Sequence, residues 1–312
     1  METPTKSNKF NSGYIALTLT SILWGTTWVA SKVAVTQLPG LQLAYIRQFI
    51  AGSLFLGFFT FIKKQPLPSW KDFKFMFVMA ILMFVMANGF SSWGLKFIPT
   101  GLASLIGALS PLSVVVIERF FYKQKNVSVL TYVGLCIGIL GVGFVFYHNM
   151  FSTIDGNLIL GLILSILAML AWSVGTIFLS RHSIGINPYY AMGWQMMLGA
   201  FMLFFLAPLL QKTIPLNEIN GKSWLAILYL IGIGSIISFI AFIYSLKKLP
   251  TAISSLYAYI NPIVAMLVAA LILKENLTTS IVIGTIVTLI GVYIVNHSIK
   301  RDQEKIIVEA EI

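Results

Sequence analysis

A stretch of seventeen residues occurs twice in this chain. The segment LKFIPTGLASLIGALSP, Leu95–Pro111, returns 151 residues later as LKKLPTAISSLYAYINP, Leu246–Pro262. The copies share leucine, lysine, proline, threonine and serine at matching positions. Such a repeat indicates that one structural unit is used twice, so we expect two related halves.

The composition places these halves in a membrane. The 312 residues are 58% hydrophobic and only 10% charged, and the mean hydropathy is +0.89. This leaves too little polar surface for a water-soluble globule. The apolar runs lack the alternation of barrel strands and suit helices of about 20 residues. The single cysteine, Cys136, lies in such a run, which argues against a disulfide framework or a thiolate metal site.

Ten apolar segments can be drawn, which predicts an all-α integral membrane protein with ten transmembrane helices. The first repeat is expected over residues 14–148 and the second over 156–298, between cytoplasmic tails at 1–13 and 299–312. The C-terminal tail mixes acidic and basic residues and is interpreted as solvated and disordered. The predicted segments are 14–35, 41–62, 73–95, 100–121, 128–147, 158–180, 188–209, 223–246, 251–273 and 279–298.

The basic residues predict the orientation of these helices. If ten helices alternate, fifteen of the 21 lysines and arginines fall on one side, four on the other and two within segments. The positive-inside rule makes the side with fifteen cytoplasmic, so both termini are expected there. Because each copy has an odd number of helices, the second five-helix repeat must be inverted relative to the first, a plan found in many secondary transporters.

The repeated segment places a proline inside the fourth and the ninth helix. Pro111 and Pro262 each remove a backbone donor and crowd the carbonyl four residues back, at Gly107 and Ala258. We expect both helices to be kinked or loosened there, either as static features or as gating positions beside a central pathway.

Aromatic and polar residues recur on particular helix faces near the middle of the predicted segments. Trp near the middle of a span is not explained by the interfacial belt, and its indole N–H needs a partner. Packing and cavity lining are both compatible with these residues taken singly. Together they predict an aromatic, polar and uncharged pocket, with Ser31, Ser91, Tyr259 and Asn261 nearby. The candidate solute-binding residues are Trp24, Thr27, Trp28, Asn88, Trp172, Thr176, Gln195 and Tyr257.

Two cations lie within predicted segments. Lys32 is close enough to the outer end of its helix to extend to the interface and to interact with the C-terminal dipole of that helix. Arg47 lies deeper, where a charge is costly and usually functional. The sequence offers no obvious carboxylate at mid-depth, which argues against proton-driven drug antiport. Arg47 is therefore predicted to meet the carboxylate of an anionic or zwitterionic solute.

Enzymatic readings find little support. The three histidines are scattered at helix ends, and the sequence has no Ser/His/Asp arrangement, no phosphate-cradling loop and no metal-ligand spacing. We therefore predict no catalytic residue, no metal and no cofactor. The net charge of +11 is accounted for by topology, so no nucleic-acid partner is expected.

In this order, these features resemble the EamA-type transporters of the drug/metabolite transporter superfamily. The resemblance rests on Trp24-Gly25 leading to Lys32, Pro39 followed by Arg47, the repeated segments ending at Pro111 and Pro262, and Lys274-Glu275-Asn276. It implies ten helices, cytoplasmic termini, a central cavity between repeats, and export or exchange of small metabolites. Members commonly carry a glutamate after the fourth and ninth helices; Glu275 matches, whereas the first-half position falls near Gln124.

The resulting hypothesis is a multi-pass secondary transporter of the bacterial inner membrane that exports a small metabolite such as an amino acid. Its expected partners are a small-molecule solute and the lipid bilayer, and a homodimer is left open. The runner-up is an antiporter of phosphorylated or nucleotide-linked sugars, and a non-transporting membrane scaffold is the alternative of another class. Phosphate-exchanging relatives would be expected to carry cations in the second-half cavity, and this sequence has none at depth there.

Overall fold

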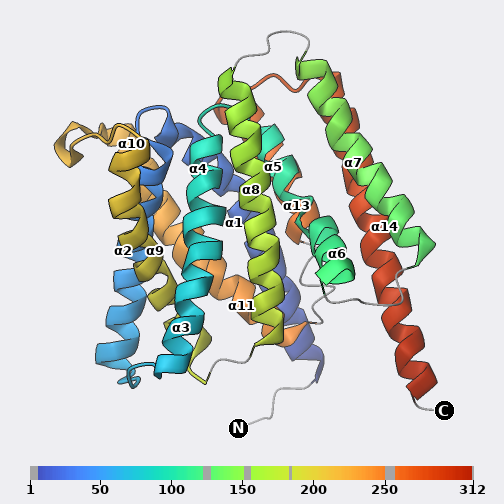
Figure 1. Cartoon of the computed structure of the whole chain (residues 1–312), viewed down its shortest axis with the longest axis horizontal. Helices are drawn as coiled ribbons and strands as arrows, with labels where there is room; N and C mark the ends of the chain where they lie inside the picture. Colours follow the sequence, from blue (N-terminus) through green and yellow to red (C-terminus); the bar gives the residue numbers. More distant parts are fainter. Residues whose placement is uncertain (1–5, 122–127, 151–155, 183–184, 250–256, 311–312) are drawn as a thin grey trace.

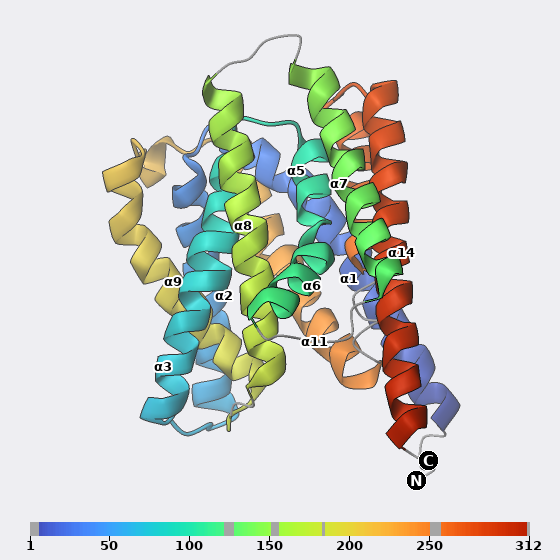
Figure 2. The same cartoon turned by 45° about the vertical axis from the view of Figure 1, so that its right-hand side comes forward.

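The chain folds as a bundle of helices (Figures 1 and 2). The computed structural model describes residues 6–121, 128–150, 156–182, 185–249 and 257–310, and no strand occurs within these ranges. In the first half the elements are α1 Lys6–Val35, α2 Gly40–Gly57, η1 Phe58–Ile62, α3 Trp70–Met79, η2 Ala80–Phe90, α4 Ser91–Gly94, α5 Thr100–Gly107, α6 Ser110–Phe121 and α7 Val129–Met150. In the second half they are α8 Gly156–Arg181, α9 Pro188–Leu210, η3 Leu216–Glu218, α10 Gly221–Tyr229, η4 Leu230–Ile237, α11 Ser238–Lys248, α13 Tyr257–Ile272 and α14 Thr279–Ala310.

Within the described residues, seven helical stretches have the length and hydropathy to cross a membrane. They coincide with the second, third, fourth, sixth, seventh, eighth and tenth predicted segments. Two shorter apolar helices, Val129–Val145 and Tyr257–Ile272, coincide with the fifth and ninth, and α1 covers the first. The protein is thus an all-helical, multi-pass membrane protein, and the number ten remains a prediction. The start of the ninth predicted segment, with Thr251, lies outside the described residues, as does Gln124.

The two halves run in opposite directions where they meet. The carboxylate of Glu275, just beyond the end of α13, accepts hydrogen bonds from the backbone N–H of Thr100 at 3.0 and 3.1 Å. Thr100 is the first residue of α5, so the start of α5 lies beside the end of α13. These two helices pack against each other, and they are therefore antiparallel, as the inverted plan requires.

Helices α7 and α14 form a second antiparallel pair, which lies side by side at one edge of the bundle (Figures 1 and 2). A Cβ added to Gly134 would lie 2.8 Å from the carbonyl oxygen of Gly291, and one added to Gly141 would lie 2.7 Å from that of Gly284. Residue numbers rise along one helix as they fall along the other. The glycines are needed here because the two backbones approach too closely for side chains.

The third and eighth segments each contain a long π-helical stretch. These stretches are η2 in the first repeat and η4 in the second, and η4 begins 150 residues after η2. A π turn widens the helix and is frequent at functional sites. The sequence analysis did not foresee either stretch, and their equivalent positions make them a property of the repeated unit.

The two repeated prolines have different outcomes. In the first repeat the helix is interrupted, since α5 ends at Gly107 and α6 begins at Ser110, one residue before Pro111. In the second repeat α13 continues through Pro262. The helix is therefore interrupted beside Pro111 and continuous through Pro262, and the kink or loosening expected at Pro262 stays a prediction.

The terminal helices are longer than predicted. Helix α1 begins at Lys6, inside the predicted N-terminal tail, and α14 continues to Ala310. The prediction of a disordered C-terminal end is wrong for residues 299–310, because their Lys, Arg, Gln, Glu and Ala content favours continuation of the helix. The start of α1 and the end of α14 lie at the same end of the bundle (Figures 1 and 2).

Candidate functional site

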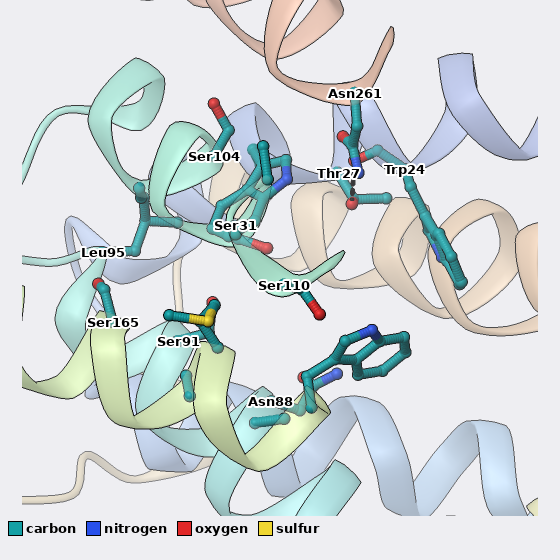
Figure 3. A pocket seen from close by; sticks show the side chains of 18 of the residues that line it. Trp24, Thr27, Ser31, Asn88, Ser91, Leu95, Ser104, Ser110, Ser165 and Asn261 are labelled. Carbon is teal, nitrogen blue, oxygen red and sulfur yellow. Dashed lines mark hydrogen bonds between the residues drawn. The ribbon is translucent and has the colours of Figure 1, made fainter. Parts of the chain in front are cut away.

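A cavity of about 180 Å³ lies between the two repeats. A water needs roughly 10–15 Å³ of such space, so the cavity can hold a small organic solute. Figure 3 shows several of its lining side chains at close range. The lining residues come from α1, α2, η2, α4, α5 and α6 of the first repeat and from α8, α11 and α13 of the second. Both halves therefore build a single site.

Trp24 of α1 is the centre of an aromatic cluster beside the cavity. Its ring lies 6.0 Å from that of Trp172 and 5.2 Å from that of Tyr257, both edge to face. The rings of Phe239 and Phe242 lie 5.2 and 5.0 Å away. The indole N–H of Trp24 donates to the carbonyl of Gly234 at 3.3 Å, which supplies the partner that a mid-membrane tryptophan needs. Trp28 also lines the cavity.

Arg47 is the cationic residue among the described residues that line the cavity, and no carboxylate belongs to that lining. Its side chain is 8% exposed, and its Nε donates to the hydroxyl of Ser235 at 2.7 Å. Ser235 and Gly234 both belong to η4. The π stretch of the second repeat thus holds both the guanidinium and the indole of Trp24. The terminal nitrogens of Arg47 make no hydrogen bond among the described residues and can receive an anion.

Hydroxyl and amide groups line other parts of the wall. Thr27 donates to the carbonyl of Trp24 at 2.7 Å, and Asn88 reaches the cavity from η2. Ser110 and Ser173 lie 2.9 Å apart, oxygen to oxygen, and Ser113 lies 2.6 Å from Ser173. This serine cluster joins α6 to α8 next to Pro111.

Two of the predicted solute-binding residues lie outside this lining. The hydroxyl of Thr176 donates to the carbonyl of Trp172 at 2.8 Å, within α8. Gln195 is 6% exposed and belongs to α9, which packs on α2 and η2 and contributes no residue to the cavity. Tyr259, which was expected nearby, donates instead to the carbonyl of Val292 in α14 at 2.6 Å. The predicted residues of α1 and η2 therefore line the cavity, whereas the predicted residue of α9 does not.

Lys32 has hydrogen-bond partners that its own helix does not reveal. Its ammonium donates to the carbonyls of Leu95 at 2.8 Å and Ile98 at 2.7 Å. These carbonyls follow the end of α4, and Leu95 lines the cavity. A cation there compensates carbonyls that have no helical partner. Glu275 compensates the start of α5 in the same way, and its carboxylate also accepts from the hydroxyl of Thr100 at 2.7 Å.

The sequence analysis missed Ser235 and the contact between Glu275 and Thr100. Ser235 carries no signal of its own in the sequence, because a serine in an apolar helix is common. Glu275 was recognised as part of a motif, but its partner lies 175 residues earlier. Among the residues that the structure describes, no group of three or more His, Cys, Asp or Glu side chains could hold a metal ion.

The model of the EamA-like transporter family matches the chain twice, over residues 11–147 and 159–297. These two ranges coincide with the two repeats on either side of the cavity. The chain belongs to the EamA-like transporter family.

Curated relatives of similar length support the same class. The chain is 26% identical over 290 residues to the uncharacterized transporter YoaV of Bacillus subtilis, covering 93% of this chain and 97% of that protein. It is 28% identical to the uncharacterized transporter sll0355 of Synechocystis, covering 98% and 95%. It is also 28% identical to the uncharacterized inner membrane transporter YedA of Escherichia coli K12, covering 82% and 81%.

The fold also occurs in a solved structure. A crystal structure described only as that of a protein aligns with a TM-score of 0.63 at 17% identity, covering 93% of this chain and 98% of the other. At that identity the likeness concerns the fold alone. The family match and the curated relatives make the protein a multi-pass membrane transporter, a class that sits in lipid and binds small solutes.

Proposed function

We propose that this protein is a secondary transporter that exports a small, amino-acid-like metabolite across a bacterial inner membrane. Its two inverted repeats would move against each other so that the cavity opens to one side at a time. Both termini would face the cytoplasm, as the distribution of basic residues favours.

The observation that carries this proposal is the character of the cavity. It contains the guanidinium of Arg47 without a carboxylate among the described residues that line it. A buried cation of this kind attracts an anionic group, since the protein does not neutralise it within the site. A solute carboxylate fits this requirement.

The remaining lining suggests how the solute is held. The rings of Trp24, Trp28, Trp172 and Tyr257 would pack against its apolar part. Thr27 and Asn88 would take its polar groups. Pro111 and Pro262 are proposed as the places where the fourth and ninth helices flex during the change of access.

The alternatives have weaker support from the same residues. A phosphorylated or nucleotide-linked sugar carries more negative charge than one arginine balances, and the described second-half residues of the lining include no cation. A scaffold without transport would not require a solute-sized cavity between the repeats.

The direct test is flux. The purified protein is reconstituted into vesicles loaded with a defined mixture of amino acids, carboxylic acids and sugar phosphates, and efflux is followed by mass spectrometry against protein-free vesicles. We expect selective loss of one or a few amino-acid-like solutes. Movement of sugar phosphates instead would favour the runner-up, and no protein-dependent efflux would favour a scaffold.

Topology can be tested in cells. Cys136 is first replaced by alanine, and single cysteines are then placed at the equivalent exposed residues Lys96 and Lys247. A membrane-impermeant thiol reagent should label the cysteine at 96 in intact cells and the cysteine at 247 only after lysis. Labelling of both from the same side would contradict the inverted arrangement.

A further inference from the structure

Two unsatisfied polar groups lie in the wall of the cavity. Among the described residues, four buried side-chain atoms lack a hydrogen-bond partner: Gln48 Oε1, Ser165 Oγ, Trp194 Nε1 and Asn261 Oδ1. Ser165 and Asn261 line the cavity, and Figure 3 shows Asn261 beside Trp24 and Thr27. A buried polar atom without a partner is unfavourable unless a water or a ligand satisfies it. Asn261 thus brings to the cavity wall a carboxamide oxygen that has no hydrogen-bond partner among the described residues.

The first repeat shows what the equivalent residue does when it is satisfied. Asn261 precedes Pro262 just as Ser110 precedes Pro111, 151 residues earlier. The hydroxyl of Ser110 is paired with that of Ser173 at 2.9 Å. In the first repeat, the polar side chain at this position is therefore hydrogen-bonded within the protein.

The second repeat lacks the matching partner. Ser173 follows Trp172, and 148 residues earlier Gly25 follows Trp24. Gly25 does lie beside Asn261, since a Cβ added to it would be 3.2 Å from the carbonyl oxygen of Asn261, but it has no hydroxyl. That Cβ would also lie 2.5 Å from Cβ of Val264, so a serine would not fit at this position without movement. The carboxamide oxygen of Asn261 is thus left without a partner among the described residues.

We propose that Asn261 determines solute specificity by accepting a hydrogen bond from an amino group through Oδ1, while Arg47 binds the carboxylate. This inference rests on the proposed function and deepens it. The two side chains together recognise both charged ends of a zwitterion, whereas Arg47 alone would accept any carboxylate. Asn261 therefore separates amino acids from carboxylic acids that have the same side chain but no amine.

The expected discrimination follows from the strength of such contacts. A hydrogen bond between an ammonium group and a buried acceptor changes affinity by roughly tenfold to a hundredfold. Removing the acceptor should cost the amino acid this factor. The deaminated acid, which makes no such bond, should lose little.

The test compares an amino acid with its deaminated acid in three forms of the reconstituted full chain: the wild type, Asn261→Leu and Ser110→Ala. Leucine resembles asparagine in shape and lacks the acceptor. The Ser110→Ala variant alters the equivalent residue of the other repeat and serves as the matched control. Competition of each compound against efflux of the best wild-type solute gives the ratio of apparent affinities, and thermal unfolding in detergent checks that each variant is folded.

We expect Asn261→Leu to lower the preference for the amino acid over its deaminated acid by roughly tenfold or more. Ser110→Ala should leave that preference unchanged. If the leucine variant fails to fold, an Asn261→Asp variant takes its place. Because aspartate keeps an acceptor oxygen, this variant should preserve the preference for the amino acid. Equal weakening of both compounds in the Asn261 variants would overturn the inference and leave a bound water as the partner of Oδ1. A wild type that moves neither compound would instead contradict the proposed function.

Discussion

The two proline-bearing helices start from nearly the same sequence and end in different structures. In the first repeat the chain turns between Gly107 and Ser110, and Pro111 becomes the second residue of α6. A proline in the first helical turn removes no intrahelical bond, because the N–H there has no partner in the helix. In the second repeat Pro262 lies within α13, where the bond to the carbonyl of Ala258 cannot form. Pro111 therefore lies in the first turn of a helix, whereas Pro262 removes one backbone hydrogen bond from the interior of a helix.

The neighbouring residues account for part of this difference. The hydroxyl of Tyr259 donates to Val292 of α14 and accepts from the side chain of Asn296. These bonds hold the start of α13 against a second helix. The serine cluster of Ser110, Ser113 and Ser173 instead holds the start of α6 against α8. The comparison teaches that the repeated sequence specifies where a helix is weak, and that its tertiary partners decide whether it breaks.

The largest expected effect comes from replacing the proline that lies inside a helix. Pro262→Ala restores an N–H for the carbonyl of Ala258 and should raise the free energy of unfolding by up to about 3 kcal/mol. If α13 flexes during transport, this variant should also move solute more slowly. Pro111→Ala should change stability by less than about 1 kcal/mol, since its ring lies in a helix's first turn. Thermal unfolding in detergent and initial efflux rates measure both, and equal stabilisation by the two variants would remove the distinction.

A second contrast concerns the equivalent residues Arg47 and Gln195. Gln195 lies 148 residues after Arg47, the same offset that joins Trp24 to Trp172, and both side chains are buried. Arg47→Ala should weaken binding of an anionic solute roughly tenfold to a hundredfold, because a charge-assisted bond is lost. Gln195→Ala should change it less than about threefold, since Gln195 lies outside the cavity lining. Competition assays in vesicles compare the two, and similar losses would show that Gln195 also contacts the solute, contrary to this expectation.

A third contrast concerns the C-terminal ends of the two repeated helices. Glu275→Ala removes the acceptor for the N–H and hydroxyl of Thr100 and should lower the free energy of unfolding by about 1–2 kcal/mol. Glu275→Gln keeps one acceptor oxygen and should recover part of this loss. Gln124, 151 residues earlier, holds the equivalent place in the sequence. If Gln124→Ala lowers the free energy of unfolding as much as Glu275→Ala, the side chains at the two helix ends stabilise the fold equally. The two repeats would then differ less at these ends than we infer.

The smallest expected effect is the loss of the serine cluster. Ser173→Ala should lower stability by about 1 kcal/mol, the typical value for a buried hydrogen bond between neutral groups. Ser110→Ala and Ser173→Ala should be less than additive in a double-mutant cycle, since they remove the same bond. Full additivity in thermal unfolding would mean that the two hydroxyls do not interact. Ser110 would then not differ from Asn261 in having a hydrogen-bond partner.

Much of the site was predictable, and the exceptions have a common cause. Seven of the nine predicted solute-binding residues line the cavity, and their contact with a solute stays a prediction: Trp24, Thr27, Trp28, Arg47, Asn88, Trp172 and Tyr257. The misplaced residue Gln195 was assigned from its depth along a helix, which is a local property. Its direction depends on where α9 packs, and α9 lies against the outer side of α2 and η2, away from the cavity. Lys32 was likewise assigned from its own helix, although its partners are carbonyls 63 and 66 residues further on.

The sequence by itself determined that this chain is a membrane protein made of two related halves, and it marked Arg47 as an unusual buried cation. Hydropathy, repetition and charge are readable because each is a property of a segment alone. Only the tertiary structure decided that the helix breaks at Pro111 and continues through Pro262, that η4 holds Arg47, and that Asn261 Oδ1 has no partner among the described residues. These outcomes depend on contacts between different helices, such as those that join residues 33, 63 and 188 positions apart, and their energies are set by which helix faces meet in the folded bundle.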